Sequence, residues 1–310
     1  MPNEHTHSHS SHTHAGHGHA PATFDRAFAI GIALNTAFVI AEVVYGLAAH
    51  SLALLADAGH NLSDVLGLAL AWGAVWLGRK PATAAFTYGF RRSSILASLA
   101  NAVVLLVAVG GIAWEAVQRL ASPSPVDSST VAWVAAAGIA VNGVTAWLFA
   151  RGSKGDLNIR GAFLHMASDA AISAGVVVAA LVTLRTGWRW LDPSVSLVIA
   201  ALIIAGTWGL LRESVRLALD GVPTGIDQAG VARYLAALPG VAQVHDLHIW
   251  SMSTTEVALT AHLVRPGAGL DDALHSQIAH DLDHHFGIAH VTIQCEAAHS
   301  EHGCQRLCAA

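Results

Sequence analysis

Charged side chains are scarce in this 310-residue chain, because Asp, Glu, Lys and Arg make up only 12% of it while 54% of the residues are hydrophobic. With a mean hydropathy of +0.50, this composition excludes an ordinary soluble domain and is typical of a membrane protein. The chain also lacks a stripe of basic residues, which argues against a nucleic-acid partner. The net charge of −5 indicates no other partner.

Cysteine is equally scarce, since the chain has only Cys295, Cys304 and Cys308, all near its C-terminal end. Such a distribution excludes a disulfide framework, and we expect reduced thiols. A cleavable signal peptide is also not expected. The first apolar run follows a polar tail of 26 residues and lacks a basic lead and a small-residue cleavage pattern.

Six long apolar runs are present, and each can span about 30 Å of hydrocarbon at about 1.5 Å per residue. They lie near residues 27–48, 52–77, 94–118, 130–150, 161–184 and 191–211. An even number of spans places both termini on one side of the membrane. Segments on that side carry ten Lys and Arg residues, against three in the opposite loops, which predicts cytoplasmic termini. Because the basic residues are mostly Arg and Ala is abundant, we expect a bacterial protein of the inner membrane.

The chain outside the six runs has a different composition. Residues 1–24 contain seven histidines among small polar residues, which predicts a disordered tail able to bind divalent metal loosely or a tail that only solvates. The breakers Gly221, Pro223 and Gly225 mark a linker after the last run. The predicted parts are the histidine-rich tail (1–24), a six-helix transmembrane domain (25–216), a linker (217–226), a soluble domain (227–299) and a His- and Cys-containing tail (300–310).

The soluble domain shows two kinds of apolar spacing. Residues 231–238 and 270–286 repeat at the spacing of a helix, whereas residues 245–250, 255–264 and 290–296 alternate like strands. The resulting order α-β-β-α-β predicts a ferredoxin-like open sandwich with helices on one face of an antiparallel sheet. We therefore expect an α-helical membrane protein of six transmembrane helices followed by a ferredoxin-like α+β domain on the cytoplasmic side.

Two of the apolar runs contain ionisable side chains at matching positions. His60 and Asp64 lie four residues apart in the second run, and His165 and Asp169 repeat this spacing in the fifth. Residues at i and i+4 share one face of a helix. His60 lies about 12 Å from the outer end of its run and Asp169 about 12 Å from the inner end of its own, so that the two pairs can meet near mid-membrane.

Two imidazoles and two carboxylates supply four ligands of the types that suit tetrahedral Zn²⁺, although Co²⁺, Fe²⁺, Cd²⁺ and Mn²⁺ accept the same set. Metal binding requires neutral His and ionised Asp, so it releases protons. A site that faces the two sides of the membrane in turn can therefore exchange metal for H⁺. The alternative is that each pair only hydrogen-bonds between helices, and two matching pairs favour the ligand interpretation.

Other polar residues in the runs are assigned to supporting roles. Asp57 shares a helix face with His60 and is interpreted either as a hydrogen-bond partner of the site or as a residue at its mouth. We interpret the following as packing or hydrogen-bonding residues rather than ligands: Asn35, Glu42, Asn101, Glu115 and Asn142.

Several segments together resemble the cation diffusion facilitator family, in particular its zinc-transporting, ZnT-like branch. They are "LLADAGHNLSD", "FTYGFRR", "RGAFLHMASDA", "LDPSVSLVIA", "VHDLHIWSMS" and "HVTIQCE", and the resemblance runs from about residue 25 to 297. It implies a homodimer of six-span subunits that exchanges cytoplasmic Zn²⁺ for H⁺, with a cytoplasmic domain that dimerises and senses metal. The transport site that it implies comprises His60, Asp64, His165 and Asp169, in which His60 favours zinc.

The same resemblance implies a cytoplasmic metal site at His245, His262 and Glu296, with His290 as a further ligand. His275 is the nearest counterpart of a helix ligand, and Gln294 stands where some members have His. The C-terminal tail carries further residues that either capture zinc or fray: His299, His302, Cys304 and Cys308.

The sequence departs from the family in two places. Arg92-Ser93-Ser94 stands where Glu is frequent after "TYGF". The loop "RKPATAAFTYGF" contains no His, Asp or Glu, so the metal site that some members have there is not expected.

We therefore expect a secondary-active exporter of divalent metal, with zinc first and Co²⁺, Ni²⁺ or Cd²⁺ as alternatives. A hypothesis from another class is a membrane-anchored metal sensor that does not transport. A sensor has no use for ligands at mid-membrane, which argues against it. An enzyme is the least favoured class, because the runs offer no substrate pocket beside the metal ligands.

Overall fold

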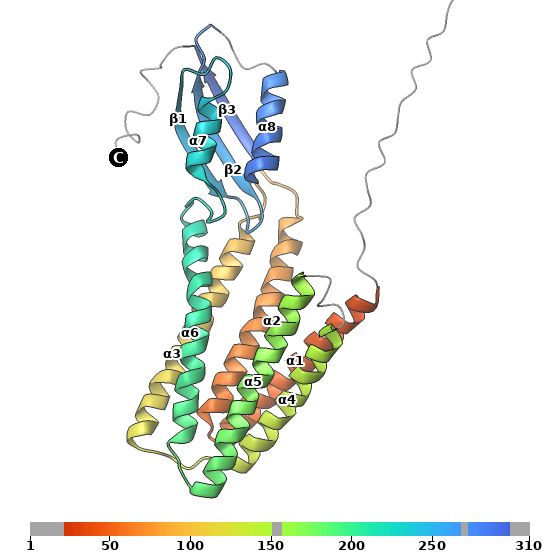
Figure 1. Ribbon diagram of the computed structural model, residues 1–310, viewed down its shortest axis with the longest axis vertical. Helices are drawn as coiled ribbons and strands as arrows, with labels where there is room; N and C mark the ends of the chain where they lie inside the picture. The colour runs from red at the N-terminus through yellow and green to blue at the C-terminus, as the bar shows by residue number, and fades with distance from the viewer. Residues whose placement is uncertain (1–21, 151–156, 268–271, 298–310) are drawn as a thin grey trace, which may run out of the picture.

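The structure is a computed structural model that describes residues 22–150, 157–267 and 272–297 (Figure 1). Most of the predicted histidine-rich tail and all of the predicted tail 300–310 lie outside the described residues. Over the described ranges the chain forms an elongated bundle of helices with a small α+β domain at one end (Figure 1).

Each of the six apolar runs forms a long helix, and most extend beyond the run by a turn or less. The helices are α1 (Ala22–Ala48), α2 (Leu52–Gly78), α3 (Ser93–Ala121), α4 (Ser128–Ala150), α5 (Leu157–Thr186) and α6 (Leu191–Ala218). Within the described residues, four stretches are long and apolar enough to cross a membrane: Ser93–Ala121, Ser128–Trp147, Phe163–Thr186 and Leu191–Ala218. The helices α1 and α2 have 27 residues each, a length that also suffices to span a bilayer.

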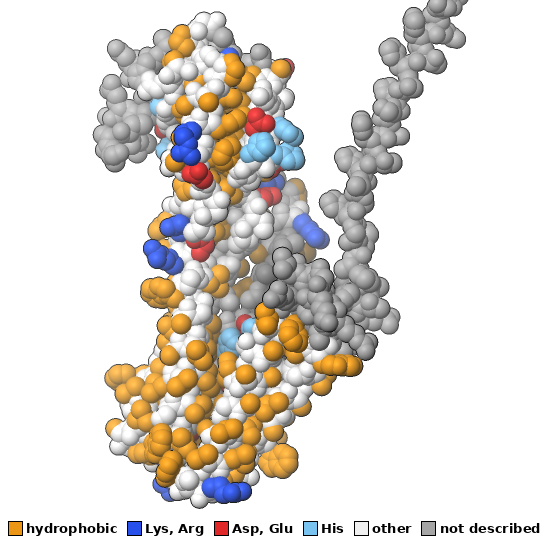
Figure 2. Space-filling view, in the orientation of Figure 1, with side chains coloured by type: hydrophobic (Ala, Val, Ile, Leu, Met, Phe, Trp, Pro, Cys, Tyr) orange, Lys and Arg blue, Asp and Glu red, His pale blue; other side chains and the backbone are white. Residues whose placement is uncertain are grey.

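The outer surface of the bundle is strongly apolar (Figure 2). Large side chains such as Val107, Trp114 and Trp133 point outward and are more than two thirds exposed in the isolated chain. A soluble monomer rarely exposes so continuous an apolar surface, whereas lipid covers such a surface at no cost.

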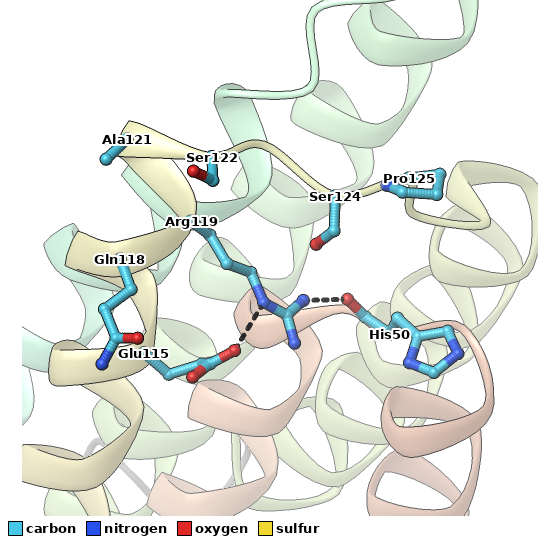
Figure 3. A pocket seen from close by; sticks show the side chains of 8 residues that line it. All are labelled: His50, Glu115, Gln118, Arg119, Ala121, Ser122, Ser124 and Pro125. Carbon is cyan, nitrogen blue, oxygen red and sulfur yellow. Dashed lines mark hydrogen bonds and ion pairs between the residues drawn. The ribbon is translucent and has the colours of Figure 1, made fainter.

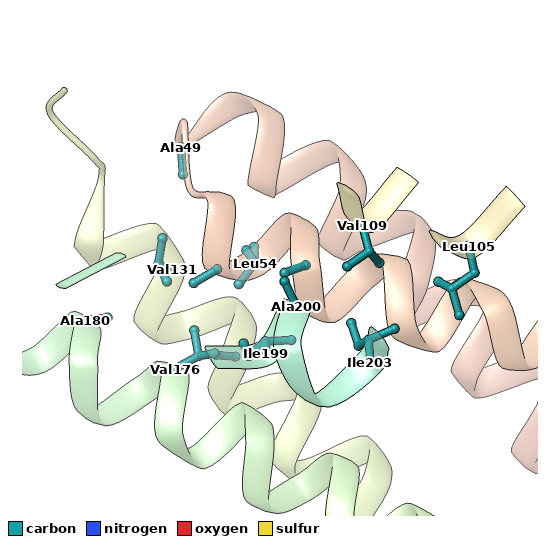
Figure 4. Packing of buried hydrophobic residues seen from close by; sticks show 13 residues of the cluster. Ala49, Leu54, Leu105, Val109, Val131, Val176, Ala180, Ile199, Ala200 and Ile203 are labelled. Carbon is teal, nitrogen blue, oxygen red and sulfur yellow. The ribbon is translucent and has the colours of Figure 1, made fainter. Parts of the chain in front are cut away.

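A cluster of buried apolar residues lies toward the end of the bundle remote from the α+β domain, and Figure 4 shows its packing from close by. Small residues at the start of α2, among them Ala53 and Ala56, are buried against Val131 of α4 and Val176 of α5. Small side chains allow helix backbones to approach closely, which is how helices associate in lipid. We call this cluster the outer core, and its buried members are Ala49, Ala53, Leu54, Ala56, Leu105, Val109, Val131, Ala135, Val176, Ala180, Ile199, Ala200 and Ile203.

A buried polar contact fixes where α2 begins. The carboxylate of Asp192, at the start of α6, accepts hydrogen bonds from the Ser51 hydroxyl and from the backbone N–H of Leu52, the latter at 2.9 Å. The Ser51 hydroxyl in turn accepts from the N–H of Leu54 at 3.2 Å. These bonds satisfy N–H groups that have no partner within the helix.

The α+β domain has the predicted order of elements. It comprises α7 (Gln228–Ala236), β1 (Gln243–Ser251), β2 (Val257–Val264), α8 (Asp272–Phe286) and β3 (His290–Glu296). Both helices contribute to a single core with one face of the sheet, through Val231 and Leu235 of α7 and Ile278 and Leu282 of α8. The ferredoxin-like arrangement of the element order is therefore found.

One feature of the predicted sheet is wrong, because the sheet is mixed rather than antiparallel. Its strand order is β1-β2-β3, with β1 antiparallel to β2 and β3 parallel to β2. The short β1–β2 connection reverses the chain, whereas α8 lies between β2 and β3 and returns the chain to the same end of the sheet.

Candidate metal centre

The structure brings His60 and Asp64 of α2 together with His165 and Asp169 of α5. One ligand atom of each residue lies within 4.8 Å of the corresponding atoms of the other three. Each pair comes from one helix face, as the spacing of four residues requires, and the two faces point toward each other. The four residues predicted from the repeated motif thus form one cluster.

The contacts within this cluster cross from helix to helix. His165 Nε2 lies 3.0 Å from Asp64 Oδ2, and His60 Nε2 lies 3.3 Å from Asp169 Oδ1. In a third contact, His165 Nε2 lies 3.7 Å from Asp169 Oδ2 on the same helix. Each histidine therefore lies beside the aspartate of the other helix, and the cluster joins α2 to α5.

Access to the four side chains is graded. The Asp169 side chain is fully buried, whereas the exposed fractions are 23% for His60, 28% for Asp64 and 40% for His165. Neither Asp169 oxygen accepts a hydrogen bond with good geometry. A buried carboxylate without hydrogen bonds is costly unless a cation compensates it, and a metal ion or protonated histidines would do so here.

The packing of the bundle differs on the two sides of the cluster. Figure 2 shows a hollow in the half of the bundle that faces the α+β domain, with histidine and acidic side chains visible at its floor. On the opposite side, residues 51–54 and 56–58 of α2 are all buried. The outer core therefore closes the remote side, and the cluster lies at the boundary between a tight and an open half.

A second cluster lies on adjacent strands of the α+β domain. His245 on β1, His262 on β2 and Glu296 on β3 place one ligand atom each within 4.8 Å of the others. His245 Nε2 is 3.3 Å from Glu296 Oε2, and His262 Nδ1 is 3.0 Å from Glu296 Oε1. Desolvation acts to raise the pKa of the Glu296 carboxyl, but the hydrogen bonds from His245 and Gln294, together with the nearby imidazoles of His245 and His262, outweigh it and hold the pKa below its ordinary value.

The structure does not bring His290 into this second cluster. His290 begins β3 and Glu296 ends it, so about 20 Å of extended strand separates them. The exposed His290 ring instead lies 5.8 Å from the ring of Tyr88, edge to face. His275 is exposed on α8, and the Gln294 amide donates to Glu296 at 3.1 Å. The tail residues His299, His302, Cys304 and Cys308 lie outside the described part of the chain.

Comparison with known families now decides the class of protein. The transmembrane domain of cation efflux proteins matches residues 28–217, and the cytoplasmic domain of cation efflux proteins matches residues 223–298. The chain belongs to the cation diffusion facilitator family.

Curated relatives of this facilitator chain are similar over nearly their full lengths. The metal cation efflux system protein CzcD of Cupriavidus metallidurans is 37% identical over 91% of this chain and 89% of its own length. The zinc transporter ZitB of Escherichia coli is 37% identical over 94% and 92%. The cadmium, cobalt and zinc/H(+)-K(+) antiporter of Bacillus subtilis is 35% identical over 90% and 91%. Among solved structures, the metal-bound C-terminal domain of CzcD from C. metallidurans is 38% identical over 23% of this chain and 99% of its own, with a TM-score of 0.22.

Sequence reasoning missed Asp246 beside the second cluster of this family member. Its Oδ2 lies 3.5 Å from His262 Nε2, and its Oδ1 lies 2.9 Å from His248 Nε2. The register of β1 shifts between His245 and His248, and Asp246 has a positive φ of 52°. Such a bulge redirects side chains, so the alternation of "VHDLHIW" does not reveal where Asp246 points.

The departure at Arg92-Ser93-Ser94 lies at the junction between the two domains of the facilitator. Arg92 forms an ion pair with Asp220, and the preceding Arg91 pairs with Glu256 at 2.7 Å. The hydroxyl of Ser94 accepts a hydrogen bond from the N–H of Thr254 at 3.1 Å. These contacts link the start of α3 to the β1–β2 connection and to the end of α6.

A pocket at the opposite end of the bundle has no comparable set of ligands (Figure 3). It has a volume of about 700 Å³, and its charged residues are Glu115 and Arg119. The Arg119 guanidinium donates to the Glu115 carboxylate at 3.0 Å and to the His50 carbonyl at 2.5 Å. The opposite charges of Glu115 and Arg119 therefore compensate each other within the wall of this pocket.

Proposed function

We propose that this cation diffusion facilitator exports Zn²⁺ from the cytoplasm across the inner membrane in exchange for H⁺, through the cluster of His60, Asp64, His165 and Asp169. The observation that carries the proposal is the convergence of these four side chains from two helices onto one point within 4.8 Å. Two imidazoles and two carboxylates fit the tetrahedral ligand set of Zn²⁺. The curated relatives named for zinc transport and for cadmium, cobalt and zinc antiport support the same class of cargo.

The crossed contacts suggest how the cluster changes cargo. With both histidines protonated, each imidazolium lies beside a carboxylate of the other helix, and the net charge of the four groups is zero. With Zn²⁺ bound to neutral histidines and two carboxylates, the net charge is again zero. The loaded and the protonated cluster therefore face a similar cost of remaining inside the membrane, while the unoccupied cluster carries two uncompensated charges.

The driving force follows from the same exchange. Moving a divalent ion outward against 100 mV costs about 4.6 kcal/mol, and each proton that returns recovers about 2.3 kcal/mol. Export of one Zn²⁺ for two protons is therefore neutral with respect to the membrane potential, and the pH gradient then drives it. Both termini lie in the cytoplasm, and the hollow in the half that faces the α+β domain admits cytoplasmic metal.

The α+β domain has two further roles in this proposal. It dimerises, which its match to the family's dimerising cytoplasmic domain supports. It also binds Zn²⁺ at His245, His262 and Glu296, where three ligands leave a fourth position for Asp246 or water. The protein is thus a transporter and not an enzyme, because metal is its cargo and its regulator.

Flux into proteoliposomes tests the proposal. Inside-out vesicles with a zinc dye in the lumen should accumulate Zn²⁺ when the lumen is acidic, and the wild-type rate should fall when the pH gradient is collapsed. Parallel measurements with Co²⁺, Ni²⁺ and Cd²⁺ rank the cargo. Zinc binding without flux of any divalent metal would instead identify a membrane-anchored sensor.

A further inference from the structure

Two buried carboxyl groups lie beside the metal cluster and take no part in it. Glu42 of α1 and Asp57 of α2 are both fully buried in the bundle. None of the hydrogen bonds or ion pairs found in the described residues joins either of them to the four metal ligands. Because the Asp57 side chain is fully buried, it does not line an exposed mouth of the cluster, and its hydrogen bond comes from Ser173.

Each of these two carboxyl groups has one satisfied oxygen. The Asn61 amide donates to Glu42 Oε2 at 3.0 Å, and the Ser173 hydroxyl donates to Asp57 Oδ2 at 3.1 Å. The other oxygens, Glu42 Oε1 and Asp57 Oδ1, have no donor in the described structure. The two carboxyl groups are nevertheless neighbours, because Asn61, which donates to Glu42, lies four residues after Asp57 on the same face of α2. Two carboxylates only accept hydrogen bonds, so a proton on either group supplies the donor that the pair lacks.

The surroundings of the pair contain few charges that could replace this proton. Two ionisable side chains outside the pair act on it electrostatically, His60 of α2 and Asp169 of α5. Over its described residues 128–147, α4 has no ionisable side chain. The ionisable residues described on α3 and α6 lie near the ends of these helices: Arg119, Glu115, Asp192, Arg212, Glu213 and Arg216. When zinc is bound and His60 is neutral, two adjacent buried carboxylates would repel each other without a compensating cation, and a proton on one of them removes that repulsion.

The position of the pair along the bundle points to a role in exchange. Asp57 precedes His60 by three residues, which places it about 4.5 Å closer to the α1–α2 turn along the helix. Glu42 lies six residues before the end of α1 at that same turn, or about 9 Å from it. Along α2, Asp57 thus lies between His60 and the outer-core residues Ala53 and Ala56. A proton that enters from the outer side meets this pair before it meets the metal ligands.

We propose that Glu42 and Asp57 form a carboxyl pair that holds one shared proton and exchanges it during transport, as a proton site separate from the four metal ligands. This inference rests on the proposed exchange of Zn²⁺ for H⁺. The proton of the pair adds to the two that the histidines carry, so that the full exchange moves one positive charge inward for each Zn²⁺ exported. When the outer side opens, a proton binds to a carboxylate oxygen of the pair; when the pair faces the cytoplasmic side, that proton leaves. The hydrogen bonds from Asn61 and Ser173 hold the two carboxyl groups in place throughout.

The test uses Glu42→Gln and Asp57→Asn in the full chain, reconstituted into proteoliposomes. An amide at either position still donates a hydrogen bond to the remaining carboxylate but cannot release a proton. Two rates are compared: Zn²⁺/Zn²⁺ exchange at equal pH, which needs no net proton movement, and Zn²⁺ uptake driven by a pH gradient. Zinc and proton dyes recorded together give the number of protons per metal. Glu115→Gln, the same chemical change outside the pair, is the matched control.

We expect each variant to retain Zn²⁺/Zn²⁺ exchange within about threefold of wild type, to lose at least tenfold in gradient-driven uptake, and to move about one proton fewer per zinc. The double variant should lose no more than either single variant, because the two groups act as one site. Infrared difference spectra of the wild type on Zn²⁺ addition should show a protonated carboxyl band that Glu42→Gln removes. This last measurement needs no flux and decides the matter if a variant folds poorly.

Three outcomes overturn the inference. An unchanged number of protons per zinc in both variants would show that the pair only joins helices. Uptake that depends on K⁺ in the wild type but not in the variants, at an unchanged proton count, would identify a K⁺ site instead. An infrared spectrum without a protonated carboxyl band would exclude the shared proton. Failure of the proposed function is distinct, because the wild type itself would then show no gradient-driven zinc uptake.

Discussion

Replacement of Asp169 by Asn should damage transport more than the same replacement of Asp64. The Asp169 side chain is fully buried and lies near both histidines, at 3.3 Å from His60 and 3.7 Å from His165. Asp64 is 28% exposed, and its close contact is with His165, at 3.0 Å. Water can take the place of a lost ligand at Asp64, because that side of the cluster faces the hollow, whereas it cannot reach Asp169.

The magnitude follows from what each variant removes. Loss of a group that merely supports a metal ligand costs about 10- to 100-fold in affinity, so loss of the buried ligand Asp169 should cost at least about 100-fold. Asp64→Asn, which water partly compensates, should cost about 10-fold. Removal of Asp169 also leaves His60 without a buried counter-charge, so the protonated state of the cluster is destabilised as well.

The assay combines equilibrium binding and flux. Zinc affinity of the purified protein is measured by calorimetry in the presence of a competing chelator, and uptake is measured in the same proteoliposomes as above. Glu115→Gln serves again as the control for loss of a carboxylate elsewhere. Equal losses for Asp64→Asn and Asp169→Asn would refute the link between burial and ligand strength, and zinc uptake that survives Asp169→Asn would refute the assignment of the transport site.

Three further predictions concern other parts of the molecule. Gly138→Ala should destabilise the fold by about 1–3 kcal/mol, because a Cβ at Gly138 would lie 2.6 Å from the Phe38 ring. A Cβ at Gly143 meets nothing within 4 Å, so Gly143→Ala should be tolerated. Thermal unfolding in detergent distinguishes the two variants. Asp127 accepts from the Thr130 N–H and hydroxyl at the start of α4, which lowers the pKa of its carboxyl. The ionised Asp127 carboxylate should stabilise the fold at a pH above its ordinary pKa of 3.8, and this stabilisation should be lost as the pH falls through the lower pKa of the folded state. At neutral pH, Asp127→Ala should lower the free energy of unfolding by about 1 kcal/mol and Asp127→Asn by much less, by the same unfolding measurement. His262→Ala should reduce the zinc bound per chain by one ion in native mass spectrometry without abolishing uptake, and loss of uptake with unchanged zinc content would contradict the separation of the two clusters.

The sequence allowed the helices and the metal residues to be predicted, because both depend on local spacing. A run of about 20 apolar residues has one stable form in lipid, and residues four apart on a helix necessarily share a face. His60 with Asp64, and His165 with Asp169, were therefore placed without knowledge of the packing. The crossed pairing of each histidine with the aspartate of the other helix was not predictable, since it depends on how α2 is rotated against α5.

The features that the sequence did not predict also depend on how elements pack together rather than on local spacing. The parallel pairing of β3 depends on the path of the chain through α8, and the direction of the Asp246 side chain depends on a bulge that alternation does not encode. The sequence indicates a packing or hydrogen-bonding role for Glu42, and the hydrogen bond that it accepts from Asn61 agrees with that role. Glu42 of α1 lies near Asp57 of α2 because the two helices pack against each other across a turn. No sequence motif in either helix predicts this pairing.

The two proposed proton locations fit the asymmetry of the bundle. The metal cluster opens toward the half that faces the α+β domain, and its exposed members, His165 above all, can be reached from there. Asp57 and Glu42 are fully buried, and Asp57 directly follows the outer-core residue Ala56. A transporter that opens to one side at a time needs a ligand set that loads from the first side and a counter-ion that loads from the second. Because Asp169 is buried and acts electrostatically on both Glu42 and Asp57, arrival of a divalent ion at Asp169 favours release of the proton that the pair holds. By the same reciprocity, protonation of the pair from the outer side favours release of the metal.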